Sequence, residues 1–298
     1  MNLKLIEAAA AAYEDLPQDD VNRLVFFRSV WNTQAEAIVD CPDTYEVPSE
    51  HDLQLCINRP MPVFKNNPVS IDAARLAKDA AAIAECMTSK DMLNEDAQKL
   101  LESMDWETIL GGMDMKLAGS EPEAFTVLFA QALVEAGDEP FNAAIAMNVL
   151  SQALRCQLDK PAAAVSKALK KLRKFEDPKP LVCPCCGSEP TLSHVGGDTT
   201  SQGRGRVLVC GQCGTDWEYE RIRCARCGEK NPNSLHYFNI EGDDAHRIAT
   251  CDECGGYMRT LFSEEGDLKP VSYDVEDVIM ARLDAIAADE RFQAKEAE

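Results

Sequence analysis

The sequence predicts an α+β fold with a mainly helical N-terminal domain, two tandem β modules that each carry a four-cysteine metal site, and a C-terminal helix. Two observations support this fold class. Up to about residue 178, alanine-rich segments place apolar residues three and four positions apart, as amphipathic helices do. Beyond that residue, pairs of cysteines alternate with short β-prone runs and glycine turns.

The length and charge of the chain limit the classes of protein to consider. Its 298 residues are 45% hydrophobic, which allows a sizeable buried core in one large domain or two ordinary ones. The formal net charge of -21 repels phosphate backbones and anionic lipid headgroups. The charge therefore argues against nucleic acid as a partner.

The sequence gives no sign of targeting to a membrane. Acidic residues interrupt and follow the alanine run at the N-terminus, unlike a secretion signal. The charge-free stretch from Phe141 to Leu154 is too short to span a bilayer. We therefore expect a cytoplasmic protein without stable membrane insertion.

The first predicted domain spans residues 1–178 and should be a helical bundle. Four segments show the helical spacing: Ile71–Met87, Asn94–Met104, Pro122–Ala136 and Phe141–Leu158. Residues 41–68 hold five prolines, which remove backbone donors and restrict the residues before them, so an ordered crossover or binding loop is expected there. Pro178 and Pro180 disfavour helix before the first cysteine pair, which places the domain boundary there.

Four Cys-x-x-Cys pairs follow and form a repeat. The pairs are Cys183/Cys186, Cys210/Cys213, Cys224/Cys227 and Cys251/Cys254. Residues 187–209 separate the first two pairs and residues 228–250 the last two, a spacing of 23 residues each time. The spacing indicates a duplicated ribbon module. We assign the two modules to residues 179–222 and 223–262, with β-prone runs at Arg206–Val209, Trp217–Ile222, Leu235–Ile240 and Tyr257–Phe262.

Each module offers four thiolates, which suit a tetrahedral metal ion. The predicted ligands are Cys183, Cys186, Cys210 and Cys213 at one site, and Cys224, Cys227, Cys251 and Cys254 at the other. We expect two metal ions, iron or zinc, one per site, because four thiolates suit zinc and a rubredoxin-like single iron equally. The metal could be purely structural or redox-active, and metal-free disulfide exchange is a third possibility.

Other residues near the cysteine pairs are not expected to be metal ligands. Cys185 lies inside the first pair and is expected to be a spectator thiol. His194 and His236 fall on predicted ribbon strands and are expected to pack or face solvent, since four cysteines already close each site. The nearby arginines are expected to balance the thiolate charge: Arg206, Arg221, Arg223, Arg226, Arg247 and Arg259. The remaining cysteines are expected to be small core residues: Cys41, Cys56, Cys86 and Cys156.

No motif for catalysis is present. The sequence lacks a Gly-x-Ser-x-Gly elbow, a phosphate loop, a dinucleotide fingerprint and a His-Glu-x-x-His pair. We therefore predict a protein that is not an enzyme. The last segment, residues 263–298, should hold an acidic helix from Val275 to about Ala288.

The cysteine-rich third of the chain resembles the formate dehydrogenase accessory protein (FdhE) family. The features that match, besides the four pairs, are Pro184, Gly187, Ser188, Pro190, Trp217, Arg221, Leu235-His236-Tyr237 and Tyr257. The sequence departs from the family at Cys185 and Arg259, and neither change removes a ligand.

This resemblance implies a cytoplasmic assembly factor. It would have an N-terminal helical domain and two rubredoxin-like sites that can hold iron, with the eight paired cysteines as ligands. It would bind the catalytic subunit of a respiratory molybdenum or tungsten formate dehydrogenase, which needs it to become active.

Two other functions stay open. The chain could be a rubredoxin-like electron-transfer or thiol redox protein that uses its metal sites directly. It could also be a zinc-ribbon nucleic-acid-binding protein, although its net charge argues against this. Arg221, Arg223 and Arg226 form the one dense basic group in the modules and could instead contact an acidic partner surface.

Overall fold

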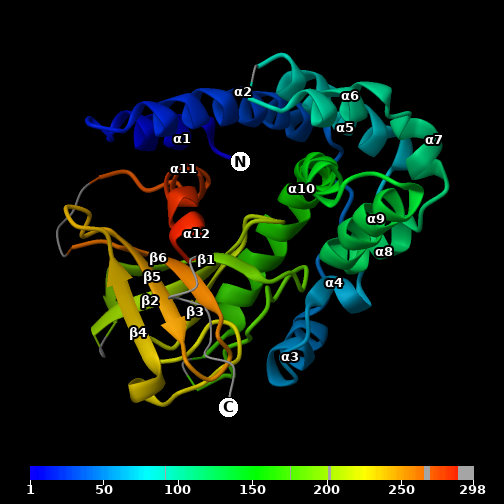
Figure 1. Cartoon of the computed structure of the whole chain (residues 1–298). Coiled ribbons are helices and arrows are strands. Elements are labelled where there is room, and N and C mark those ends of the chain that lie inside the picture. The colour runs from blue at the N-terminus through cyan, green and yellow to red at the C-terminus, as the bar shows by residue number, and fades with distance from the viewer. Residues whose placement is uncertain (91, 175, 201–202, 265–268, 288–298) are drawn as a thin grey trace, which may run out of the picture.

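The computed structural model describes residues 1–90, 92–174, 176–200, 203–264 and 269–287. Within these residues, ten α-helices come first, then a six-stranded sheet, then two more α-helices (Figure 1). The predicted fold class is confirmed: a mainly helical N-terminal part, a β region with two four-cysteine groups, and a helical C-terminal part. The helices are α1 Leu3–Ala11, α2 Gln18–Asp40, α3 Glu50–Asn58, α4 Val63–Asn66, α5 Ala73–Thr88, α6 Glu95–Ser103, α7 Trp106–Gly111, α8 Met115–Ser120, α9 Pro122–Ala136, α10 Pro140–Leu172, α11 Tyr273–Ile279 and α12 Ala281–Ala287.

Side-chain caps set where several of these helices begin. Asp72, Asn94 and Asp105 each accept a hydrogen bond from a backbone N–H in the first turn of the helix that follows. α9 starts at Pro122, where the missing N–H costs nothing, and ends before Gly137 in the left-handed conformation (φ 108°). The four predicted helical segments correspond to α5, α6, α9 and α10.

Helix α10 is the centre of the helical part and is longer than predicted. It runs for 33 residues, and its apolar face contacts α2, α3, α5, α6 and α9. Pro161 lies inside it, yet the helix continues. The reason is burial on both sides of the proline: Leu158, Val165 and Leu169 are 0–2% exposed and hold the two halves on one core.

The proline-rich segment 41–68 is not continuous helix, as predicted, but neither is it a single loop. It contains α3 and α4. Ser49 caps α3 by accepting from the N–H of Asp52, and Pro62 lies at the N-cap of α4, where a proline removes no helical hydrogen bond.

The six strands form one sheet in the order β3-β2-β1-β6-β5-β4. The strands are β1 Pro190–Thr200, β2 Gly203–Cys210, β3 Asp216–Tyr219, β4 Leu235–Asn239, β5 His246–Cys251 and β6 Tyr257–Phe262. Within each half the neighbouring strands are antiparallel, whereas β1 and β6 pair in parallel, with Leu192 opposite Arg259 and Val195 opposite Phe262. The first strand of the first module therefore pairs with the last strand of the second module.

The C-terminal helices join the sheet to the first helices of the chain. On one face of the sheet, Leu192, Ile248 and Leu261 pack with Met280 and Leu283 of the α12 region. α11 instead contacts α1 and α2 through a cluster that contains Ile6, Trp31, Val275 and Ile279. Figure 1 shows α11 and α12 between α1 and the sheet. Of the predicted segment 263–298, residues 265–268 and 288–298, including Ala288, lie outside the described residues.

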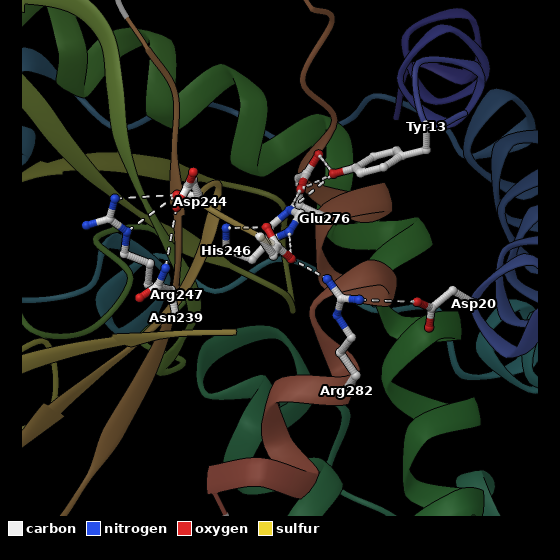
Figure 2. Close-up of polar contacts among 9 residues, drawn as sticks. Tyr13, Asp20, Asn239, Asp244, His246, Arg247, Glu276 and Arg282 are labelled. Carbon is white, nitrogen blue, oxygen red and sulfur yellow. Dashed lines mark hydrogen bonds and ion pairs between the residues drawn. The ribbon is translucent and has the colours of Figure 1, made fainter. Parts of the chain in front are cut away.

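A buried polar cluster stabilises the junction between the C-terminal helices, the sheet and the start of the chain (Figure 2). His246 of β5 contacts Asp243 through Nδ1 at 2.9 Å and Glu276 of α11 through Nε2 at 3.0 Å. The hydroxyl of Tyr13 donates to Glu276 at 2.8 and 2.9 Å, and Arg282 pairs with Asp243. Three distant parts of the sequence therefore meet at one imidazole.

Within the part of the chain that the structure describes, every helix is too short or too polar to cross a lipid bilayer.

Candidate metal centres

The first four-cysteine group is assembled from two tight turns. Cys183, Cys186, Cys210 and Cys213 place their sulfur atoms within 4.8 Å of one another. In each turn the N–H of the following glycine, Gly187 or Gly214, donates to the carbonyl of the first cysteine at 2.9 Å. Both glycines have positive φ (84° and 73°), a conformation that residues with a Cβ seldom adopt.

The sulfur separations fit a metal ion held by four thiolates. A metal–sulfur distance of about 2.3 Å in a tetrahedron puts sulfurs about 3.8 Å apart, whereas a disulfide bond is about 2.0 Å long. Cys183 and Cys213 are 3.5 Å apart, as are Cys186 and Cys210. The donor set and its spacing can therefore hold one zinc or iron ion.

The first group is sealed from solvent by the helical part. Its four cysteines are 0–3% exposed. The backbone N–H groups of Val63 and Phe64, at the start of α4, donate to the carbonyls of Pro184 and Cys185 at 2.9 Å, and Gln212 donates to the carbonyl of Ser151 in α10 at 3.1 Å. No sequence pattern pointed to Gln212 or Ser151.

This burial disfavours ionisation of two thiols of the first group. Removal from water raises the pKa of Cys183 and Cys186 well above its ordinary value, because a bare thiolate is poorly solvated there. A divalent ion would reverse that balance, since its charge compensates the thiolates directly.

The second group has the same arrangement but faces solvent. Cys224, Cys227, Cys251 and Cys254 also lie within 4.8 Å of one another, and the sulfur pairs Cys224–Cys254 and Cys227–Cys251 are both 3.8 Å apart. Cys227 and Cys254 are exposed, whereas Cys224 and Cys251 are buried. One half of this centre is therefore open to solvent.

Backbone donors stabilise negative charge at the second group. The N–H groups of Arg226 and Cys227 donate to the sulfur of Cys224 at 3.3 and 3.5 Å. Burial alone would raise the pKa of Cys224, but these hydrogen bonds, together with those from the neighbouring thiols, outweigh it and hold that pKa below its ordinary value.

The other cysteines lie outside both four-sulfur groups. The thiol of Cys185 is buried and contacts the carbonyl of Ala162 in α10 at 3.8 Å. Cys41, Cys56 and Cys156 are buried and Cys86 is half-buried, which agrees with the predicted role in packing.

The two histidines have polar partners and are absent from both groups. His194, on β1, is buried, with Nε2 2.8 Å from the hydroxyl of Ser263 and Nδ1 3.2 Å from that of Tyr273. His236, on β4, is exposed and lies 2.9 Å from Asp252.

Two of the arginines predicted to balance thiolate charge, Arg206 and Arg247, contact other groups. Arg206 is buried, donates to the carbonyl of Arg223 at 2.8 Å and to the hydroxyl of Ser193 at 3.2 Å. The guanidinium of Arg247 lies 4.1 Å from the ring centroid of Phe262. Their observed contacts therefore stabilise the sheet.

Comparison with known proteins agrees with this geometry. A family model described as FdhE, central domain, matches residues 182–221. A Protein FdhE homolog from Aquifex aeolicus (strain VF5) is 36% identical over 111 residues, which are 37% of this chain and 38% of that protein. Protein FdhE from Salmonella paratyphi A (strain ATCC 9150 / SARB42) is 38% identical over 105 residues, which are 34% of this chain and 33% of that protein.

These matches span 33% to 38% of the relatives' length. A structural comparison covers far more. The match to the crystal structure of the FdhE protein from Pseudomonas aeruginosa covers 99% of this chain and 92% of that chain. The TM-score is 0.56 and the sequence identity is 17%. The resemblance predicted from the cysteine pairs is therefore confirmed: the chain carries FdhE-type sequence in its cysteine-rich region and shares the fold of the Pseudomonas aeruginosa FdhE protein over 99% of its length.

Proposed function

We propose that this chain is a non-catalytic, cytoplasmic assembly factor that binds the catalytic subunit of a respiratory formate dehydrogenase and is required for its maturation. The observation that carries the proposal is the FdhE-type sequence around the cysteine pairs, on a chain with the FdhE fold. In this role the helical part and the sheet form a binding scaffold.

We further propose that the eight paired cysteines hold two metal ions, one in each four-sulfur group. The sulfur separations of 3.5 and 3.8 Å support this assignment. A bound ion would supply positive charge that fixes four thiolates in a tetrahedron. Zinc and iron fit this donor set equally well.

Deletion of the gene in the host organism, grown anaerobically with formate, tests the proposed function. The expected result is loss of formate dehydrogenase activity while the catalytic polypeptide is still made, with activity restored by the intact gene. Full activity in the deletion strain would contradict the role in maturation.

Electron transfer is the second candidate, favoured by the exposure of Cys227 and Cys254 at the second site. A metal open to solvent on one side can exchange electrons with a docked partner. Redox titration of the iron-loaded chain, followed by its visible absorption, tests this. Reversible bleaching of one iron per chain would support the redox role, and an unchanged spectrum would exclude it.

A further inference from the structure

Among the described residues, β4 forms the outer edge of the second module. β4 is the last strand of the sheet, and among the described residues it pairs only with β5. In the first module the strand at the same position is β1, and there the edge is covered by β6 in parallel. The pairing of β1 with β6 shows that the first strand of a module can accept a further strand in parallel. An open edge strand presents unpaired backbone donors and acceptors to another polypeptide.

An apolar hollow of about 170 Å³ adjoins this edge. Tyr237, Ala249 and Met258 lie side by side across β4, β5 and β6, and all three line it. The packing of Leu261 and Ile248 against α12 occupies the opposite face of the sheet. On the face of the sheet that carries the hollow, the linker between the modules forms one wall. Ile222 of this linker is 59% exposed.

The charge around the hollow is opposite to that of the whole molecule. Among the residues that the structure describes, the lining includes four arginines and no aspartate or glutamate, although the chain carries a net charge of -21. Arg223 pairs with Glu220 at 2.9 Å and Arg226 pairs with Glu189. Arg221 is exposed, and no ion pair or hydrogen bond joins it to any other residue that the structure describes.

The hollow also borders the solvent-facing metal site, because Cys224 lines it. A polypeptide bound along β4 would therefore lie beside the second four-cysteine group. A metal ion bound in the second module, and not one in the first, could then change its spectrum when the polypeptide binds.

The size of the hollow limits its occupant. Sites for small-molecule cofactors usually measure about 300–1,000 Å³, so 170 Å³ suits a single apolar side chain better. A second copy of this chain would bring another charge of -21 to the contact, which disfavours self-association.

We propose that the β4 edge binds an extended segment of the partner polypeptide, which adds to the sheet as a seventh strand. Alternate side chains of a strand share one face, so the segment would place an apolar residue in the hollow and a carboxylate beside Arg221. The inference rests on the proposed function, and it names the surface of this chain that meets the catalytic subunit of formate dehydrogenase.

Binding of the purified, metal-loaded full chain to that catalytic subunit, measured by biolayer interferometry, tests the inference. Arg221→Glu and Ile222→Asp should each raise Kd about tenfold or more, because one reverses the rim charge and the other places a charge in the apolar wall. Lys78→Glu on α5 and Val39→Asp on α2 are matched controls at exposed sites and should change Kd less than about twofold. All four variants should keep two metal ions per chain and the thermal midpoint of the unmodified chain.

The outcomes separate the two proposals. If the unmodified chain binds, and Arg221→Glu and Ile222→Asp bind as tightly as the controls, the β4 edge is not the binding surface. The assembly role then still stands. If the unmodified chain does not bind, the proposed function fails and the inference with it. If sedimentation shows a dimer that Arg221→Glu disrupts, the occupant is a second copy and the inference is overturned.

Discussion

At the scale of single residues, the assignment of ligands depends on the contrast between Cys213 and Cys185. Both thiols are buried, but only Cys213 belongs to a four-sulfur group. Cys213→Ser should lower the metal content by about one ion per chain, because a neutral hydroxyl is a poor ligand for zinc or iron. Mass spectrometry of metals in anaerobically purified protein measures this.

Cys185→Ser is the matched control, since Cys185 contacts a helix carbonyl and not the other group members. It should retain both ions. An unchanged metal content in Cys213→Ser, or a loss in Cys185→Ser, would show that the first site has been assigned wrongly.

A second residue-scale prediction concerns pH and His246. Burial by itself lowers its pKa, but hydrogen bonds and charges from Asp243 and Glu276 outweigh this and raise the pKa from 6.5 to about 9. The protonated imidazole therefore stabilises the fold fully below pH 6.5, and this contribution is lost as the pH rises through about 9. Its size is about 3 kcal/mol at most, from about 1.4 kcal/mol per pKa unit.

Chemical denaturation between pH 6 and pH 10 tests the prediction. His246→Gln should lack this part of the pH-dependent loss of stability, whereas His236→Gln, at an exposed histidine, should keep it. The same slope in all three proteins would mean that His246 is not charged in the folded state.

At the scale of elements, the two proposed metal sites should release their ions at different rates. Helices α4 and α10 cover the first site, whereas Cys227 and Cys254 of the second are exposed. A chelating dye should therefore remove one ion quickly and the other much more slowly, by tenfold or more, because the buried site must open first. Stopped-flow and manual-mixing absorbance give the two phases.

Cys227→Ser should abolish the fast phase and leave the slow one, which assigns the fast phase to the second site. Release of both ions in one phase, or a fast phase that persists in this variant, would contradict the difference in burial.

The sequence predicted the elements that depend on local patterns. The helical segments that became α5, α6 and α9, and the runs that overlap β2, β3, β4 and β6, follow from apolar periodicity and β-propensity. β5 was missed, and β1 was expected only as the strand that carries His194, without bounds. β1 contains a proline and two glycines and β5 is short and partly polar, so neither has strong propensity of its own. Pairing with β2 and β6 makes them strands, which is a long-range effect.

The candidate site was predictable only in part. The Cys-x-x-Cys spacing brings two sulfurs together locally, and the repeat of the spacing pointed to the right two groups. The burial of one group and the exposure of the other depend on α4 and α10, which lie far away in the sequence. The domain boundaries at residues 178, 222 and 262 stay predictions, although one continuous sheet joins the strands of both modules.

At the scale of the whole molecule, the charge distribution predicts weak contact with nucleic acid. A net charge of -21 repels phosphates at long range, and Arg223 and Arg226 are already paired with glutamates. Fluorescence anisotropy with labelled duplex DNA at 150 mM salt should show no binding at micromolar protein. A micromolar or tighter Kd with a steep salt dependence would revive the nucleic-acid alternative.

The most direct test of the assembly role is an anaerobic pull-down of the tagged chain from its own host grown with formate, with mass spectrometry of the co-purified proteins. The account predicts recovery of the formate dehydrogenase catalytic subunit with the intact chain, and weaker recovery with the Arg221→Glu variant. Recovery of nucleic acid, or of no formate dehydrogenase subunit under conditions where that subunit is made, would contradict it.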